Sequence, residues 1–243
     1  MSSGRTLLEV ANLSKSFGGL VAVNGLSFTV KEREVLGIIG PNGSGKTTVL
    51  NLISGAFRST SGNIYLSGQQ ISQKSAHHIA RAGVSRTFQL VRVLPGLSVI
   101  DNVMAGAVFG HRRLWNQQAR SHAESLISRV GLEDKRHSPV SALTYIDQKR
   151  VELARALAGD PQVLLLDEWL AGLNPSELQT GIALIQSLSE EGRTIILVEH
   201  VMDAIRTLCD RCVVMNSGQL LAEGSPDAVL SDPAVITAYL GED

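Results

Sequence analysis

The stretch of sequence that decides the fold is Gly40-Pro41-Asn42-Gly43-Ser44-Gly45-Lys46-Thr47-Thr48. It fits the phosphate-loop pattern G-x-x-x-x-G-K-[ST] at every fixed position. An apolar run at residues 35–39 predicts a buried strand that enters the loop, and residues 48–53 predict the helix that leaves it. Glycines let backbone N–H groups close around a polyphosphate, and the helix start adds positive potential. The stretch therefore predicts an α/β protein that binds a nucleotide.

A second segment supplies the groups needed for hydrolysis. Residues 163–166 are four consecutive apolar residues, and two carboxylates, Asp167 and Glu168, follow them. Open α/β sheets bind their ligands at this end of a strand. Lys46 would then reach the β- and γ-phosphates of ATP, and Thr47 and Asp167 would hold Mg²⁺. Glu168 would polarise a water molecule for attack on the γ-phosphate, which favours hydrolysis over transfer to a second substrate.

The bulk composition excludes several classes of protein. The 243 residues are 44% hydrophobic and 19% charged, as in an ordinary globular protein, and the net charge of −1 gives no electrostatic reason to expect nucleic acid as a ligand. No apolar run approaches the ~20 residues that cross a bilayer. The N-terminus lacks a signal-peptide core, so a cytoplasmic location is expected.

Cys209 and Cys212 form a C-x-x-C motif, which could indicate a redox pair or half of a zinc site. The chain has no second such pair, and Cys212 begins an apolar, strand-like run. Both cysteines are therefore interpreted as buried small hydrophobes.

The order of patterns along the chain predicts one α/β domain, residues 1–243, with a helical subdomain at about residues 90–158 inserted in it. Expected strands cover residues 8–13, 26–30, 35–39, 63–66, 84–89, 163–166 and 194–198. Expected helices cover residues 75–82, 98–108, 114–130, 148–158 and 175–191, and a hairpin around residues 216–218 precedes two short helices.

These motifs, in this order, resemble the ATP-binding subunits of ABC transporters over essentially the whole chain. The resemblance implies a P-loop NTPase core with an N-terminal antiparallel β subdomain. It also implies that Phe17 stacks on adenine, that Gln89 contacts Mg²⁺ and senses a transmembrane partner, and that His200 contacts the γ-phosphate. Each residue alone has a plainer interpretation: a core aromatic, a surface amide and a strand-end histidine. His77 and His78 are expected on a solvated helix face.

Residues 17–25, 83–89, 171–175 and 235–242 further resemble the branched-chain amino acid importers. That group implies a head-to-tail pair with a second ATPase subunit, two transmembrane permease subunits and, indirectly, a substrate-binding protein. The chain would then lie on the inner face of the membrane, and residues from about 89 to 105 would pass movement to a permease. Two alternatives remain open: a soluble ABC ATPase acting in translation or DNA repair, and a weakly hydrolysing nucleotide sensor.

The sequence departs from the family pattern at its signature segment, which reads Leu143-Thr144-Tyr145-Ile146-Asp147-Gln148. Ile146 stands where glycine lets the backbone approach the partner's γ-phosphate, and Asp147 adds a negative charge. Thr144 and Asp147 also fit an ordinary capping box. We therefore expect a weakened signature, and one strong nucleotide site in an asymmetric heterodimer.

Two further positions depart from the pattern. Trp169 replaces the usual proline after the acid pair, so it could alter how Glu168 is presented. Arg33 replaces a glycine, which would cost stability if the turn needs a positive φ.

Overall fold

The computed structural model describes residues 4–240, and the chain forms two compact units. Unit 1 consists of the chain up to Ala76 together with the chain from Leu170 onward. Unit 2 is the intervening segment His77–Trp169. This second unit contains the expected helices of residues 90–158, and it extends beyond them on both sides.

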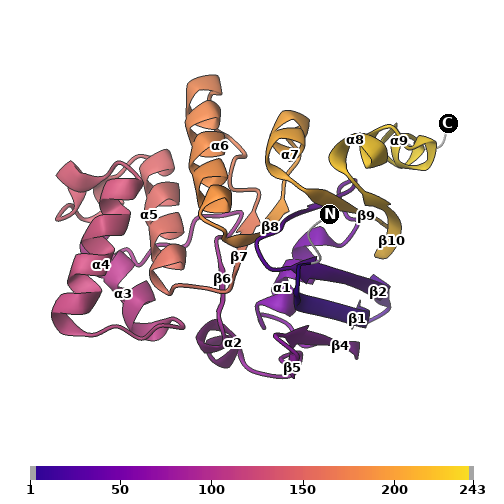
Figure 1. Ribbon diagram of the computed structural model, residues 1–243, viewed down its shortest axis with the longest axis horizontal. Coiled ribbons are helices and arrows are strands. Elements are labelled where there is room, and N and C mark those ends of the chain that lie inside the picture. Colours follow the sequence, from indigo (N-terminus) through magenta and orange to yellow (C-terminus); the bar gives the residue numbers. More distant parts are fainter. Residues whose placement is uncertain (1–3, 241–243) are drawn as a thin grey trace. The chain divides into compact units, whose positions relative to one another are not determined.

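Unit 1 begins with an antiparallel sheet of order β2-β1-β4-β5 (Figure 1). Its strands are β1 (Thr6–Phe17), β2 (Leu20–Lys31), β4 (Ser61–Leu66) and β5 (Gln69–Gln70). Leu8, Leu13, Val23 and Val30 are fully buried on these strands, whereas many of their neighbours are exposed. One covered face and one solvated face are typical of antiparallel sheets.

Unit 1 also contains the strands around the phosphate loop. β3 (Val35–Ile39) pairs in parallel with β8 (Thr194–Val198) on one side and β9 (Arg211–Asn216) on the other, and β10 (Gln219–Gly224) pairs antiparallel with β9. Every residue of β3 and β8 is buried, which explains why their sequences are almost entirely apolar. The helices of unit 1 are α1 (Lys46–Ile53), α6 (Pro175–Glu190), α7 (Met202–Leu208), α8 (Pro226–Leu230) and α9 (Pro233–Leu240).

Unit 2 contains a parallel strand pair, β6 (Val84–Arg86) and β7 (Val163–Asp167), and a group of packed helices (Figure 1). The α-helices are α2 (Ala76–Ala82, which begins one residue before the unit), α3 (Val99–Phe109), α4 (Asn116–Arg129) and α5 (Tyr145–Ala158), and two short 3₁₀ turns lie at Glu133–Lys135 and Val140–Ala142. α3 packs on α4 and α5, and Val103, Val151 and Ala154 are completely buried there. No helix within residues 4–240 is long and apolar enough to span a membrane.

Most of the predicted elements are present, with shifts at their ends. The strand at residues 194–198 is correct to the residue, and the capped helix beginning at Pro175 is confirmed. The strand expected at residues 84–89 ends at Arg86, so Gln89 lies in a loop. The helix expected from Gln148 starts at Tyr145, because the Thr144 hydroxyl caps it by accepting from the Asp147 N–H. Helix α7 was not predicted.

Candidate nucleotide-binding and catalytic residues

The phosphate loop of unit 1 can be built only with glycine at two of its positions. A Cβ atom on Gly40 would lie 2.0 Å from the carbonyl oxygen of Met215, and one on Gly45 would lie 2.4 Å from that of Ala22. Both glycines also have positive φ, 146° and 102°. In contrast, a Cβ on Gly43 meets no atom within 4 Å, so space remains beside the middle of the loop.

The polar groups of this loop fit a bound polyphosphate. Lys46 is the first residue of α1, and its Nζ donates to the carbonyl oxygens of Gly40 (2.8 Å) and Pro41 (2.9 Å), so the ammonium is held across the loop. The Ser44 hydroxyl is buried without a hydrogen-bond partner among residues 4–240. A buried hydroxyl with no partner costs free energy, and a phosphate oxygen would satisfy it.

Phe17, the candidate adenine-stacking residue, ends β1 with 41% of its surface exposed. Its ring meets Phe57 edge to face, with 5.2 Å between the ring centroids, and the Lys15 ammonium lies 4.8 Å from its centre. Phe57 follows α1 and donates its N–H to the carbonyl of Asn51. The exposed ring of Phe17 therefore rests on a second aromatic fixed to the phosphate-loop helix, a partner that sequence reasoning missed.

In unit 2, the first carboxylate of the acid pair is paired with an arginine. Asp167 is 1% exposed at the end of β7, and its Oδ2 lies 2.9 Å from Nη2 of Arg86 at the end of β6. Burial lowers the pKa of Arg86, and the Asp167 carboxylate opposes that effect. Arg86 was not predicted to have a role, because the parallel pairing of β6 and β7 is what brings it to Asp167.

The second carboxylate, Glu168, meets the predicted loop glutamine. Nε2 of Gln89 donates to Oε2 of Glu168 at 2.8 Å, although 79 residues separate them in the sequence. Glu168 is half-buried, and its φ of 50° lies in the left-handed region, which is uncommon for a residue other than glycine. The structure thus brings together two candidate residues that were identified separately.

The loop after Gln89 is held by a buried carboxylate on α5. Glu152 is fully buried and accepts hydrogen bonds from the N–H groups of Phe88 (3.2 Å) and Arg92 (2.8 Å). Burial raises the pKa of Glu152, although these two N–H groups act in the opposite direction. Two guanidinium groups, of Arg86 and Arg92, each lie 4.4 Å from the centre of the Phe88 ring.

His200 follows β8 in unit 1 and is exposed, in agreement with a residue available to a ligand. Its neighbour Glu199 is 1% exposed and accepts the Leu170 N–H at 2.6 Å, which fixes the start of the segment after the acid pair. Downstream, Asn174 and Glu177 form a complete capping box at the start of α6.

The signature segment forms the first turn of α5 in unit 2. Tyr145 is exposed, Ile146 is half-buried, and Asp147 is turned inward with 4% exposure. The Asp147 carboxylate pairs with Lys135 and with Arg150. Asp147 is therefore neutralised locally, whereas the side chain of Ile146 still occupies the position where the family pattern has glycine.

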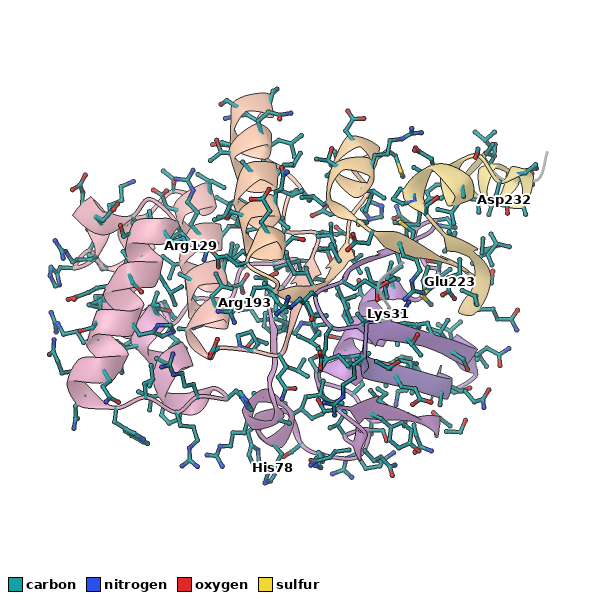
Figure 2. All side chains as sticks on the ribbon, viewed as in Figure 1. Lys31, His78, Arg129, Arg193, Glu223 and Asp232 are labelled. Atoms are coloured by element: carbon teal, nitrogen blue, oxygen red, sulfur yellow. The ribbon has the colours of Figure 1, made fainter. Side chains whose placement is uncertain are left out.

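The remaining sequence interpretations concern residues outside the catalytic groups. Cys209 and Cys212 are buried free thiols, and a Cβ on Gly37 would lie 3.0 Å from both sulfur atoms. The hydrogen bond with Cys212 and burial both raise the pKa of the Cys209 thiol, so it stays protonated. His77 and His78 are exposed on α2, as predicted. His78 is labelled in Figure 2.

Each unit offers only a few side-chain oxygen atoms that could bind a metal ion. Among residues 4–240, no three His, Cys, Asp or Glu side chains are grouped so that they could hold a metal ion alone. Mg²⁺ is usually bound by one or two protein oxygens together with substrate phosphates and water. The hydroxyl of Thr47 and the carboxylate of Asp167 are donors of this kind.

Known protein families and solved structures are similar to this chain in sequence and in fold. The profile of the ABC transporter family matches residues 23–171, and the profile named branched-chain amino acid ATP-binding cassette transporter matches residues 219–243, of which 241–243 lie outside the described residues. Among solved structures, the ADP conformation of the ATP-binding cassette MJ1267 superposes with a TM-score of 0.87 and 29% identity, over 98% of this chain and 100% of that one. A dimeric cassette, MJ0796 with ADP and phosphate, gives a TM-score of 0.82 at 25% identity, over 90% and 99% of the two chains.

Curated proteins align with this chain over nearly the full length of both sequences. The high-affinity branched-chain amino acid transport ATP-binding protein BraF of Pseudomonas aeruginosa is 40% identical, covering 98% of this chain and 99% of its own. LivG of Escherichia coli, with the same description, is 38% identical over 97% and 98%. The lipopolysaccharide export system ATP-binding protein LptB of Haemophilus influenzae is 33% identical over 98% of each.

The fold and the phosphate loop define a P-loop NTPase of the ATP-binding cassette class. The chain belongs to the ABC transporter family, as one of its ATP-binding subunits, and it is an ATPase.

Proposed function

We propose that this chain hydrolyses ATP to power an importer of branched-chain or related amino acids. The observation that carries the proposal is the 40% identity to BraF over 98% of the chain, together with the match of residues 219–243 to the branched-chain profile. Two permease subunits, a second ATPase subunit and a substrate-binding protein would complete the transporter. The chain would reach the inner face of the membrane through the permeases.

The proposed roles follow the chemistry of the groups in each unit. In unit 1, Phe17 stacks on adenine, the loop from Gly40 to Thr48 with Lys46 binds the phosphates, and His200 contacts the γ-phosphate. In unit 2, Glu168 polarises the attacking water, Gln89 orients that carboxylate, and Asp167 binds metal. Thr47 in unit 1, and Gln89 and Asp167 in unit 2, would supply oxygens to Mg²⁺, which would neutralise charge on the phosphate oxygens.

Turnover by the assembled complex tests this proposal. Lys46→Ala should weaken ATP binding, whereas Glu168→Gln should keep binding and reduce kcat by at least about a hundredfold. Lys74→Ala and Glu190→Gln make the same chemical changes at exposed positions and should leave the rate unchanged. Residual hydrolysis by Glu168→Gln near the rate of the unmodified complex would refute the role given to Glu168.

A second candidate, the weakly hydrolysing sensor, is favoured by one observation, the isoleucine in the signature segment. Transport separates the two candidates. Proteoliposomes with the complete complex should take up leucine, isoleucine or valine in an ATP-dependent manner. ATP binding without turnover or uptake would favour the sensor, and outward transport, in line with the similarity to LptB, would reject the importer.

A further inference from the structure

Unit 2 contains a buried lysine on the second turn of α5. Lys149 is 1% exposed, and its Nζ donates to the carbonyl oxygen of Trp169 at 2.9 Å, with a second, longer contact of 3.5 Å to that of Glu168. The ammonium also lies 5.2 Å from the centre of the Tyr145 ring. A buried charge is costly unless it is well bonded, so these contacts must offset the desolvation of the amine.

Trp169 completes a reciprocal pair. Its Nε1 donates to the carbonyl oxygen of Lys149 at 3.2 Å, and its side chain is 1% exposed. Each residue therefore bonds the main chain of the other across 20 positions of sequence. The proline that the family pattern places at position 169 has no indole N–H, so the second of these bonds depends on the tryptophan.

The peptide held in this way is the one that carries the candidate catalytic carboxylate. Glu168 has a φ of 50°, a conformation that costs roughly 1–2 kcal/mol for a residue with a Cβ atom. Such a conformation persists only where surrounding contacts hold it. Charge-assisted hydrogen bonds from an ammonium to carbonyl oxygens are about twice as strong as neutral ones.

We propose that Lys149 is a positioning residue, which holds the main chain at Glu168 and Trp169 so that the Glu168 carboxylate stays on Gln89. This inference rests on the proposed function, since it assigns the base that Lys149 positions. Lys149 does not itself touch the reacting atoms. α5 starts with the signature segment. In the proposed heterodimer this helix would therefore both face the partner's nucleotide and hold this chain's own carboxylate. In that heterodimer, a shift of α5 at the partner's nucleotide site would move the base at this chain's own site.

Two measurements test this role. In the assembled complex, Lys149→Met should lower kcat about tenfold or more while KM for ATP changes less than about twofold, and Lys149→Arg should recover much of the loss. In the full-length chain alone, amide exchange at residues 168–172 should become about tenfold faster in Lys149→Met, with no change at residues 46–53. Lys74→Met, the same substitution at an exposed position, should leave both measurements as they are.

These measurements distinguish a failure of the role proposed for Lys149 from a failure of the proposed function. Unchanged exchange at residues 168–172, or unchanged kcat in an active complex, overturns the positioning role. A parallel rise in KM would assign Lys149 to nucleotide binding instead, which also overturns it. If the unmodified complex does not hydrolyse ATP, the proposed function fails, and exchange still decides the role of Lys149. Should Lys149→Met not fold, Trp169→Phe removes only the indole donor and should accelerate exchange at the same residues.

Discussion

Arg33 lies in the turn between β2 and β3 with a φ of 64°, where the family pattern has glycine. Its N–H donates to the hydroxyl of Thr194 at 2.9 Å, so the backbone is fixed in this conformation whichever side chain is present. The sequence interpretation made the cost of Arg33 conditional on a positive φ in this turn, and the structure shows one. A left-handed conformation costs roughly 1–2 kcal/mol at a residue with a Cβ atom.

Arg33→Gly should therefore stabilise the protein. Part of the relief is offset because glycine also gains freedom in the unfolded chain, which leaves a net gain of about 0.5–1 kcal/mol in the free energy of unfolding. Urea unfolding measures it. Glu32→Gly, at the preceding exposed position without a positive φ, should lower stability instead. Equal effects of the two substitutions would contradict the explanation.

We propose that Ile146 weakens the signature segment. The negative charge of Asp147, the other predicted defect, is paired with Lys135 and Arg150. Ile146→Gly should therefore raise ATPase turnover of the assembled complex between about two- and tenfold, at most ~1.4 kcal/mol of activation free energy. Ile146→Ala removes the branched side chain but not the Cβ atom, so it should give a smaller increase. An unchanged rate in the glycine variant would count against a weakened signature.

At the scale of elements, the contact between α3 and α5 depends on glycines. A Cβ atom on Gly106 would lie 2.1 Å from the carbonyl oxygen of Arg155, and one on Gly110 would lie 2.3 Å from the Cα of Gly159. The helix and the loop that follows it can approach α5 this closely only without side chains.

Gly106→Ala should thus destabilise unit 2 by about 1–3 kcal/mol through overpacking, although alanine favours a helix more than glycine does. Thermal unfolding should show a lower Tm. Gly96→Ala is the matched control, because a Cβ atom there meets nothing within 4 Å. A Tm for Gly106→Ala equal to that of the control would mean that α3 and α5 do not need this contact.

The carboxylate of Glu152 predicts a pH dependence of stability. Burial raises its pKa above the ordinary value of 4.5, so the folded protein binds this proton more tightly than the unfolded chain does. Its contribution is then fully present below pH 4.5 and is lost as the pH rises through the folded pKa. Relative to Glu152→Gln, the native protein should lose free energy of unfolding as the pH rises above 4.5, measured by urea titrations at each pH. A difference that grows with pH would contradict this.

The sequence predicts some elements better than others for physical reasons. The strand of residues 194–198 is a threonine followed by four apolar residues, and Asn174 with Pro175 marks a helix start, so both are recognisable locally. The start of α5 was placed too late, because its first turn is Tyr-Ile-Asp without a clear apolar face. Helix α7 follows Val201, which provides no side-chain cap, so the sequence carries no start signal there.

In the candidate site, too, some features can be recognised from local sequence and others cannot. The phosphate loop and the acid pair are consecutive residues, and sequence alone identifies them. The contacts of Arg86 with Asp167, Gln89 with Glu168 and Lys149 with Trp169 join residues 81, 79 and 20 positions apart. Spacing along the chain gives no information on such pairs; only the pairing of β6 with β7 and the packing of α5 produce them.

At the scale of the whole molecule, each unit contains groups to which we assign a proposed role in ATP hydrolysis. Lys46 and His200 belong to unit 1, and Asp167, Glu168 and Gln89 belong to unit 2. The chain passes from one unit to the other at residues 76–77 and again at residues 169–170. The second passage comes one residue after the acid pair, and Glu199 accepts a hydrogen bond from the N–H of Leu170, the first residue in unit 1 after it.

Capture of the tagged chain from mildly solubilised native membranes tests the proposed assembly. We expect two permeases and a second ATPase whose signature segment has glycine at the position of Ile146. The reason is that a chain with a weakened signature needs a partner that completes the site on its own phosphate loop. Mass spectrometry identifies the partners. Recovery of ribosomes or DNA-repair proteins would reject the transporter, and recovery of this chain alone as a homodimer would reject the asymmetric pair.

The glycine at position 37 has a practical consequence for spectroscopy. It makes room for the sulfur atoms of Cys209 and Cys212, the two cysteines of the chain, and both are buried. A cysteine introduced at an exposed position would therefore react with a maleimide or a nitroxide reagent while the native thiols stay protected. Gln69 in unit 1 and Gln117 in unit 2 are exposed positions suited to such a pair of probes. Pulsed electron paramagnetic resonance could then follow the separation of the units through the nucleotide cycle in the otherwise unaltered protein.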